Sequence, residues 1–99
     1  MIRGTTPTLS FAIPFDTDLL SEAYVTLSQD EKVVVEKKLS DCNVDRRRLS
    51  VRLEQEDTLK LDCDCKTEVQ IRAKTKDNEA LASEIFVVNT HRILKDGVI

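Results

Sequence analysis

Apolar residues alternate with polar or small residues in five short segments of this 99-residue chain. An alternation with a period of two places every second side chain on one face of a β-strand. Several such strands at short spacing are typical of an all-β sandwich or barrel. The alternating positions are Leu9, Phe11 and Ile13; Ala23, Val25 and Leu27; Leu49, Val51 and Leu53; Val69, Ile71 and Ala73; and Leu81, Ile85 and Val87, with Ser83 in place of an apolar residue.

These five segments, with two further apolar runs at Val33-Val34-Val35 and Ile93-Leu94, predict seven strands joined by short polar connections. Residues 29–32 and 76–79 are polar stretches between strong β segments, so both predict hairpins. Acidic residues at Glu56 and Asp57 suit the start of a helix, which predicts one helical turn near residues 56–61. The predicted strands are 8–13, 21–28, a strand that begins at Val33, 48–55, 67–75, 80–88 and a short one at 93–94.

The pattern also predicts which side chains face the core. In the third strand we expect Lys37 to share the inward face, with its stem over apolar surface and its ammonium in water. The strand 8–13 and the run 93–99 are expected at sheet edges, because chain ends often lie at the borders of sandwiches. The other positions expected against the core are Val33, Val35 and Leu39, Leu19 and Leu20, Leu53 and Leu61 at the two ends of the helical turn, and Val98 and Ile99, which either cover the core or meet a partner subunit.

A chain of 99 residues has room for one hydrophobic core and not for two, so we expect one domain that spans residues 1–99. The net charge is −3, with acidic and basic residues interspersed, which argues against a general nucleic-acid binder. The run Arg46-Arg47-Arg48 is the local exception, and we expect it to form a solvated turn or edge strand. The sequence predicts no signal peptide and no membrane span, so folding in the cytosol is expected.

The three cysteines suggest a metal site that their spacing does not support. Three is an odd number of cysteines, and in a reducing compartment this argues against a disulfide framework. Cys63 and Cys65 would share one face of a strand, and with Cys42 and His91 they could complete a tetrahedral zinc site. The single residue between Cys63 and Cys65 is too short for the usual ligand knuckle, so small, partly buried thiols are the simpler interpretation.

No arrangement of residues predicts catalysis. Phosphate-cradling loops need glycines, and the chain has only Gly4 and Gly97. A single histidine, His91, has no recognisable nucleophile or orienting group at a meaningful spacing. We therefore expect that the protein is not an enzyme and has no catalytic, cofactor-binding or metal-binding residues.

Four segments carry a resemblance to a known class of proteins: Arg3-Gly4-Thr5-Thr6-Pro7-Thr8 running on to Leu9-Ser10-Phe11-Ala12-Ile13-Pro14-Phe15-Asp16, Val51-Arg52-Leu53-Glu54-Gln55-Glu56-Asp57-Thr58, Val69-Gln70-Ile71-Arg72, and Ile93-Leu94-Lys95-Asp96-Gly97-Val98-Ile99. They resemble small structural proteins encoded in phages and prophages of Gram-positive bacteria. The strand order is similar, more distantly, to the N-terminal immunoglobulin-like domain of upper baseplate proteins in lactococcal phages. Those domains usually open with Gly-Asp or Gly-Thr before an alternating apolar strand, and Gly4-Thr5 matches that opening. This chain lacks the helical extension of that family.

The resemblance implies an immunoglobulin-like β-sandwich of about seven strands that serves as a virion structural or adaptor protein of a tail or baseplate. It implies protein–protein contact with other virion proteins, leaves a homo-oligomer open, and implies no nucleic-acid or membrane partner. The expected location is the virion, after synthesis in the bacterial cytoplasm. Two alternatives stay open: a host-cell module that binds carbohydrate or protein, and a metal or redox protein that uses Cys42, Cys63 and Cys65.

Overall fold

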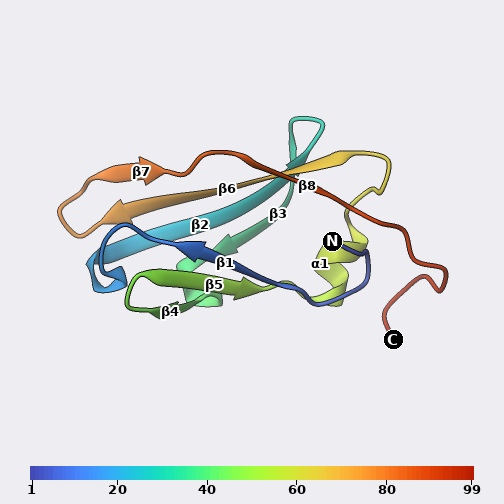
Figure 1. The fold of residues 1–99 in the computed structure, drawn as a ribbon, viewed down its shortest axis with the longest axis horizontal. Helices are drawn as coiled ribbons and strands as arrows, with labels where there is room; N and C mark the ends of the chain where they lie inside the picture. Colours follow the sequence, from blue (N-terminus) through green and yellow to red (C-terminus); the bar gives the residue numbers. More distant parts are fainter.

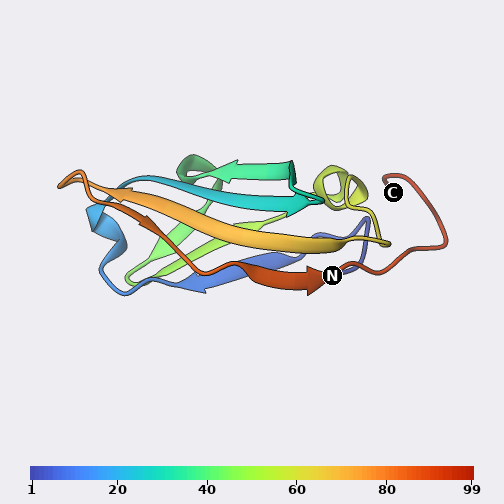
Figure 2. The same cartoon turned by 90° about the horizontal axis from the view of Figure 1, so that it is seen from above.

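Two antiparallel sheets packed face to face make up the computed structural model, which describes residues 1–99 (Figures 1 and 2). The smaller sheet has the order β1-β5-β4, and the larger has the order β3-β2-β6, with β7 and β8 both paired to the far side of β6. The strands are β1 (Thr8–Ala12), β2 (Leu20–Gln29), β3 (Lys32–Lys38), β4 (Asn43–Asp45), β5 (Arg48–Arg52), β6 (Lys66–Thr75), β7 (Ala80–Ala82) and β8 (Phe86–Asn89).

Three short helical segments complete the chain. They are η1 (Thr17–Leu19), η2 (Leu39–Asp41) and α1 (Gln55–Leu59). Helix α1 confirms the helical turn predicted near residues 56–61. None of these segments has the length and apolar character that a membrane-crossing helix needs.

The predicted all-β sandwich is confirmed, but its connectivity differs from an immunoglobulin-like order. In immunoglobulin domains the second and third strands lie in different sheets. Here β2 and β3 form a hairpin within one sheet, with Leu27 opposite Val35. The turn of this hairpin holds Asp30 and Glu31 at φ values of 50° and 63°, a left-handed pair that matches the twist of a tight hairpin.

The core lies between the two sheets and follows the predicted alternation. The inward apolar positions of β2, β5 and β6 lie against this core. Leu53 and Leu61, which precede and follow α1, are both buried as expected. Leu20 is buried too, whereas the prediction for Leu19 is wrong, because that side chain is 47% exposed at the end of η1. The twelve buried apolar residues are Ile13, Leu20, Ala23, Val25, Leu27, Val35, Leu49, Val51, Leu53, Leu61, Val69 and Ile71.

A β-bulge overturns the predicted position of Val33. The pairing of β2 with β3 shifts register between Leu27 and Ser28, so that Ser28 lies opposite Val33. Paired residues share a face, and Ser28 lies on the outer face of β2, so Val33 points outward and is 61% exposed. The extra residue in the bulge breaks the alternation that joined Val33 to Val35.

The predicted strand 80–88 is interrupted, and its apolar side chains are not buried. Ser83 ends β7 because its hydroxyl accepts the N–H of Ile71 at 3.1 Å, in place of the backbone C=O that would continue the ladder. The register against β6 then shifts by one residue before β8 begins. Leu81 shares the inward face with Ala73, as predicted, but is 41% exposed at the edge. The inward positions predicted at Ile85 and Val87 are wrong, because Val87 pairs with the outward Glu68 and both side chains are exposed.

The C-terminal residues depart from the prediction in part, and contact of Val98 and Ile99 with a partner subunit stays a prediction. Residues 93–94 do not form a strand, and Val98 and Ile99 do not cover the core, because they are 55% and 89% exposed. Two hydrogen bonds between the Gln55 side-chain amide and the backbone of Ile99, at 2.9 and 3.2 Å, hold the tail beside α1. The tail makes too few sheet contacts for its apolar residues to be buried in this chain.

Lys37 faces inward on β3 as predicted, but its ammonium is bound to a carboxylate rather than to water. Its Nζ lies 2.8 Å from Oδ2 of Asp57 in α1, and both side chains are largely buried. Burial alone would raise the pKa of Asp57, but the hydrogen bonds from Lys37 and from the N–H of Glu54 outweigh it and lower that pKa from 3.8. The hydrogen bond to Asp57 likewise raises the pKa of Lys37 above 10.5. This pair fastens α1 to the edge strand β3.

Replacement of Leu53 tests the assignment of faces. Leu53→Ala is expected to lower the free energy of unfolding by about 2–5 kcal/mol, because it leaves a cavity beneath α1. Thr26→Ala, on the outer face of β2, is the matched control and is expected to cost well below that range. Urea denaturation of both variants measures the difference, and equal losses would contradict the assigned faces.

Replacement of Asp57 tests the ion pair through its pH dependence. A carboxyl whose pKa is lowered on folding stabilises the protein above 3.8, and that stability is lost as the pH falls through the folded pKa. Asp57→Asn is therefore expected to cost about 1–3 kcal/mol at neutral pH. The difference in the free energy of unfolding between wild type and variant is expected to shrink well below pH 3.8.

Urea denaturation at neutral and acidic pH measures that difference. Glu56→Gln is the matched control, since Glu56 is an exposed carboxylate of the same helix. A difference that stays constant over the acid range would show that the carboxylate charge of Asp57 does not stabilise the fold.

Candidate functional site

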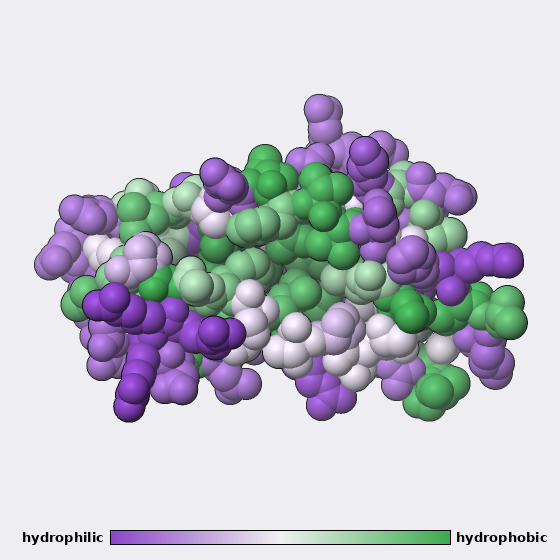
Figure 3. Space-filling view, in the orientation of Figure 1, coloured by the Kyte–Doolittle hydropathy of each residue, from purple (hydrophilic) through white to green (hydrophobic).

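One side of the sandwich is an open seam between the edges of the two sheets. The seam is bounded by β1 of the smaller sheet and by β7 and β8 of the larger sheet (Figures 1 and 2). Figure 3 looks onto this side of the molecule and shows apolar side chains gathered in its centre, between the two sheets. Both bounding edges lack a further strand, so the sandwich is not closed here.

The seam is closed at one end by the N-terminal residues. Met1 to Arg3 run beside the residues that follow β8, with a bond from the N–H of Arg3 to the C=O of His91 at 3.0 Å. The N–H of His91 donates to the C=O of Met1 at 2.7 Å, and the amino group of Met1 donates to the C=O of Asn89 at 2.9 Å. These bonds join the N-terminus to the larger sheet before the chain enters β1 of the smaller sheet.

An aromatic pair bridges the middle of the seam. Phe11 of β1 and Phe86 of β8 have ring centroids 6.4 Å apart, with the rings tilted by 44°. That separation is within the range of attractive aromatic pairs. Phe86 is still 47% exposed, so the pair joins the two edges without sealing them.

Beyond this aromatic pair the seam opens into an apolar hollow of about 320 Å³. One wall comes from the end of β1 and the turn after it, and the other from β6 and β7. The side chains that define the two walls are Ala12, Ile13 and Phe15 on one side and Ile71, Leu81 and Ala82 on the other. A hollow with apolar walls at an exposed strand edge suits contact with another apolar side chain rather than polar chemistry.

Three arginines stand beside this hollow. Arg46, Arg47 and Arg48 are exposed, as predicted, at the turn between β4 and β5. Backbone bonds from Ile13 N to Arg47 O (2.7 Å) and from Thr17 N to Arg46 O (2.6 Å) hold that turn against the wall of the hollow. None of the three arginines lies within 4.0 Å of a carboxylate, and only Arg48 has an acidic cross-strand neighbour, Asp45, so the turn beside the hollow carries exposed positive charge.

The structure does not bring the cysteines and His91 together as one ligand set. Cys42 follows η2 and packs against the core, with its thiol donating to the C=O of Lys38 at 3.2 Å. Cys63 and Cys65 lie in the loop after α1, well separated from η2 along the long axis of the molecule (Figures 1 and 2). Among these four residues, only Cys63 belongs to a group of neighbouring metal-ligating side chains.

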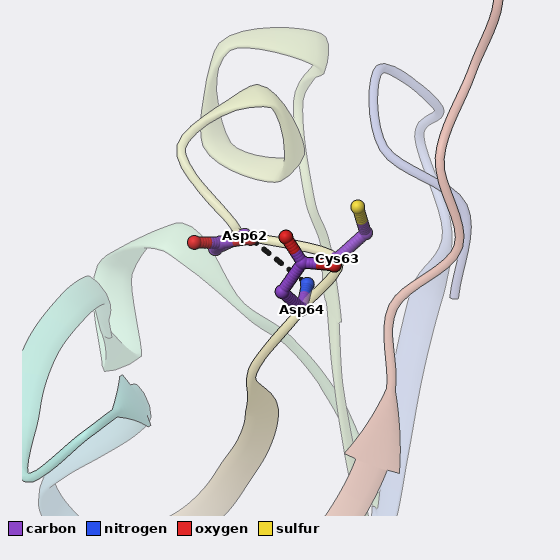
Figure 4. Close-up of side chains that lie close together, drawn as sticks. All are labelled: Asp62, Cys63 and Asp64. Carbon is purple, nitrogen blue, oxygen red and sulfur yellow. Dashed lines mark hydrogen bonds between the residues drawn. The ribbon is translucent and has the colours of Figure 1, made fainter.

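That group is formed by Asp62, Cys63 and Asp64, whose ligand atoms lie within 4.8 Å of one another (Figure 4). All three side chains are exposed, and Asp62 and Cys63 extend in different directions from the loop. Asp62 already has a structural role, because its Oδ1 accepts the N–H of Asp64 at 2.8 Å and shapes the turn. Exposed acidic groups of this kind are explained by loop geometry alone.

The environments of two thiols disfavour the thiolate form. Burial, with the charge of Asp41 added, raises the pKa of Cys42. Burial and the adjacent carboxylate of Asp30, 3.6 Å from its sulfur, raise the pKa of Cys65. A reactive or metal-binding cysteine needs the opposite environment, one that lowers the pKa of its thiol.

Sequence reasoning anticipated part of the seam. It placed strand 8–13 at a sheet edge and the arginine run at a solvated turn, and both positions agree with the structure. It missed the hollow and the exposed apolar edge of β7 and β8. The signal was Ser83, the one polar residue at an alternating apolar position. Comparisons with protein-family models, with curated proteins and with solved structures found no match for this chain.

The cysteines are expected to be dispensable for the fold. Cys42→Ser is expected to cost about 1–3 kcal/mol because a hydroxyl replaces a thiol that packs against the core. Cys63→Ser, at an exposed loop position, is the matched control and should be close to neutral. The triple variant at Cys42, Cys63 and Cys65 should keep its β-type circular dichroism. Stoichiometric zinc in the purified protein, with unfolding on chelation, would overturn this expectation.

Proposed function

We propose that this protein is a virion structural or adaptor module, of a phage or prophage tail or baseplate, that acts by protein–protein contact. The observation that carries the proposal is the open seam, where exposed apolar side chains lie beside an uncovered strand edge. Surfaces of this kind are characteristic of docking sites for proteins. The resemblance of the N-terminal segment and of residues 51–58 to small phage structural proteins points to a virion as the setting.

The composition of the seam favours a protein partner over a carbohydrate. Sugar binding generally uses exposed aromatic faces, and the one aromatic side chain that is exposed, Phe86, is engaged with Phe11. The other exposed apolar side chains of β7, β8 and the link between them are aliphatic: Leu81, Ile85 and Val87. Aliphatic side chains on a sheet edge are suited to packing against the side chains of another polypeptide.

The proposal is tested on particles from a bacterial strain that encodes the chain. Virions released after prophage induction are purified on a density gradient and examined by mass spectrometry. The chain is expected to co-sediment with tail and capsid proteins in fixed proportion. Particles that contain the other structural proteins but lack this chain, which instead stays with the cell fraction, would contradict the proposal and favour a host-cell binding module.

A further inference from the structure

Alternate residues of β1 present their backbone N–H and C=O groups to an edge that no strand covers. β1 is the last strand of its sheet and pairs only with β5. A bond from Leu53 N to Pro7 O, at 2.9 Å, marks one hydrogen-bonded pair of this ladder. A second bond, from Ile13 N to Arg47 O at 2.7 Å, shows that the backbone N–H and C=O groups of the odd-numbered residues point toward β5. Since antiparallel pairing alternates bonded and non-bonded pairs, the residues that face the open edge are Thr8, Ser10 and Ala12.

The side chains around this edge are arranged for an added strand. Leu9, Phe11 and Ile13 of β1 point toward the core side, and the apolar hollow continues beyond them between the two sheets. The outward side chains of the even-numbered residues are small and uncharged. A strand added at this edge would place alternate side chains over the hollow, which calls for apolar residues at every second position.

The exposed arginines at the end of β1 indicate which residues would flank the apolar part of an added strand. Arg48 lies opposite Ala12, at the C-terminal end of β1, and Arg46 and Arg47 precede it in the turn. None of these cations lies within 4.0 Å of a carboxylate, although Asp45 is the cross-strand neighbour of Arg48. Both sheets of the protein are antiparallel throughout, so an added antiparallel strand would begin next to the arginines. Acidic residues are therefore expected just before its apolar alternation.

A second copy of this chain does not supply that charge. If two β1 strands paired with each other in antiparallel fashion, Thr8 of one copy would lie beside Ala12 of the other. The next residue across the sheet from Thr8 is Arg52, another cation. Arg48 of one copy would then be level with Arg52 of the other, so this pairing brings like charges together and charge complementarity favours a different partner.

We propose that β1 accepts an extended segment of a partner protein as an added antiparallel strand, in which acidic residues precede an alternating apolar stretch. The acidic residues meet Arg46 to Arg48, and the apolar side chains fill the hollow beside Ala12 and Ile13. This inference rests on the proposed function only for the identity of the partner as a neighbouring virion protein; the docking itself follows from the geometry of the edge.

Binding of a synthetic peptide to the full chain tests the proposal. The peptide has two glutamates followed by three valine–threonine repeats and carries a fluorophore, and binding is measured by fluorescence anisotropy. Wild type is expected to bind it, with an affinity that falls as sodium chloride is raised, since the glutamates contact exposed arginines. The same residues in an order without alternation should bind at least about tenfold more weakly.

Ser10→Pro removes one outward N–H without removing any bond of the ladder to β5. Proline is tolerated in an edge strand when its missing N–H faces solvent, so the melting temperature is expected to change little. Affinity for the peptide is expected to fall about tenfold or more. Ser10→Ala, which keeps the backbone donor, is the matched control and should bind as wild type does. Equal affinity of Ser10→Pro and Ser10→Ala would overturn the proposal.

Charge reversal gives a second readout should Ser10→Pro fail to fold. The double variant Arg46→Glu and Arg47→Glu is expected to lose binding of the glutamate peptide. It is expected to gain binding of a matched peptide with lysines in place of the glutamates. No change of preference would overturn the proposal, and so would an absence of binding by wild type. Self-association of wild type that Ser10→Pro abolishes would assign the edge to a second copy instead. None of these results depends on finding the chain in virions, so failure here and failure of the proposed function are distinguishable.

Discussion

Burial of the inward side chains of β5 against those of β2 and β6 is the interaction on which the rest of the structure depends. Leu49 and Val51 of β5, and Leu53 directly after it, are at most 1% exposed, and Val25 and Leu27 of β2 are fully buried. Each such side chain contributes about 1.5–3 kcal/mol relative to an exposed one. The smaller sheet has only three short strands, which are marginal alone and acquire stability by covering the larger sheet.

Polar groups at one end of the sandwich are buried only where each finds a partner. Gln29 donates to the C=O of Asp62 at 2.8 Å and to the hydroxyl of Thr67 at 3.0 Å, and its Oε1 accepts the N–H of Asp62 at 2.9 Å. Thr67 in turn bonds Thr90 at 3.1 Å. No buried side-chain polar atom lacks a hydrogen-bond partner. The loop after α1 is thus fastened to β2 by the side-chain amide of Gln29.

The edges of the two sheets are protected unequally. β3 carries Lys37, whose ion pair with Asp57 brings α1 against that edge. On the opposite side, Met1 to Arg3 cover only the end of β8, and Arg3 also donates to the C=O groups of Leu59 and Leu61 at the end of α1. β1 has neither a covering segment nor an inward charge, which are the usual devices that keep edges from pairing. That unprotected edge, next to an apolar hollow, is what makes the seam a candidate docking surface.

The sequence by itself determined the strands of the core, the hairpins, the turn of helix and the edge position of residues 8–13, because alternation and turn chemistry are local. Only the tertiary structure decided the sheet order, the outward position of Val33 and the break at Ser83. A bulge or a one-residue register shift depends on which strand pairs with which, and single-chain alternation does not contain that information. The ion pair of Lys37 with Asp57 and the hollow beside Arg46 to Arg48 likewise arise from segments distant in sequence. For the same reason, the apolar residues of 80–88 appeared to belong to the core, whereas the fold leaves them at an open edge.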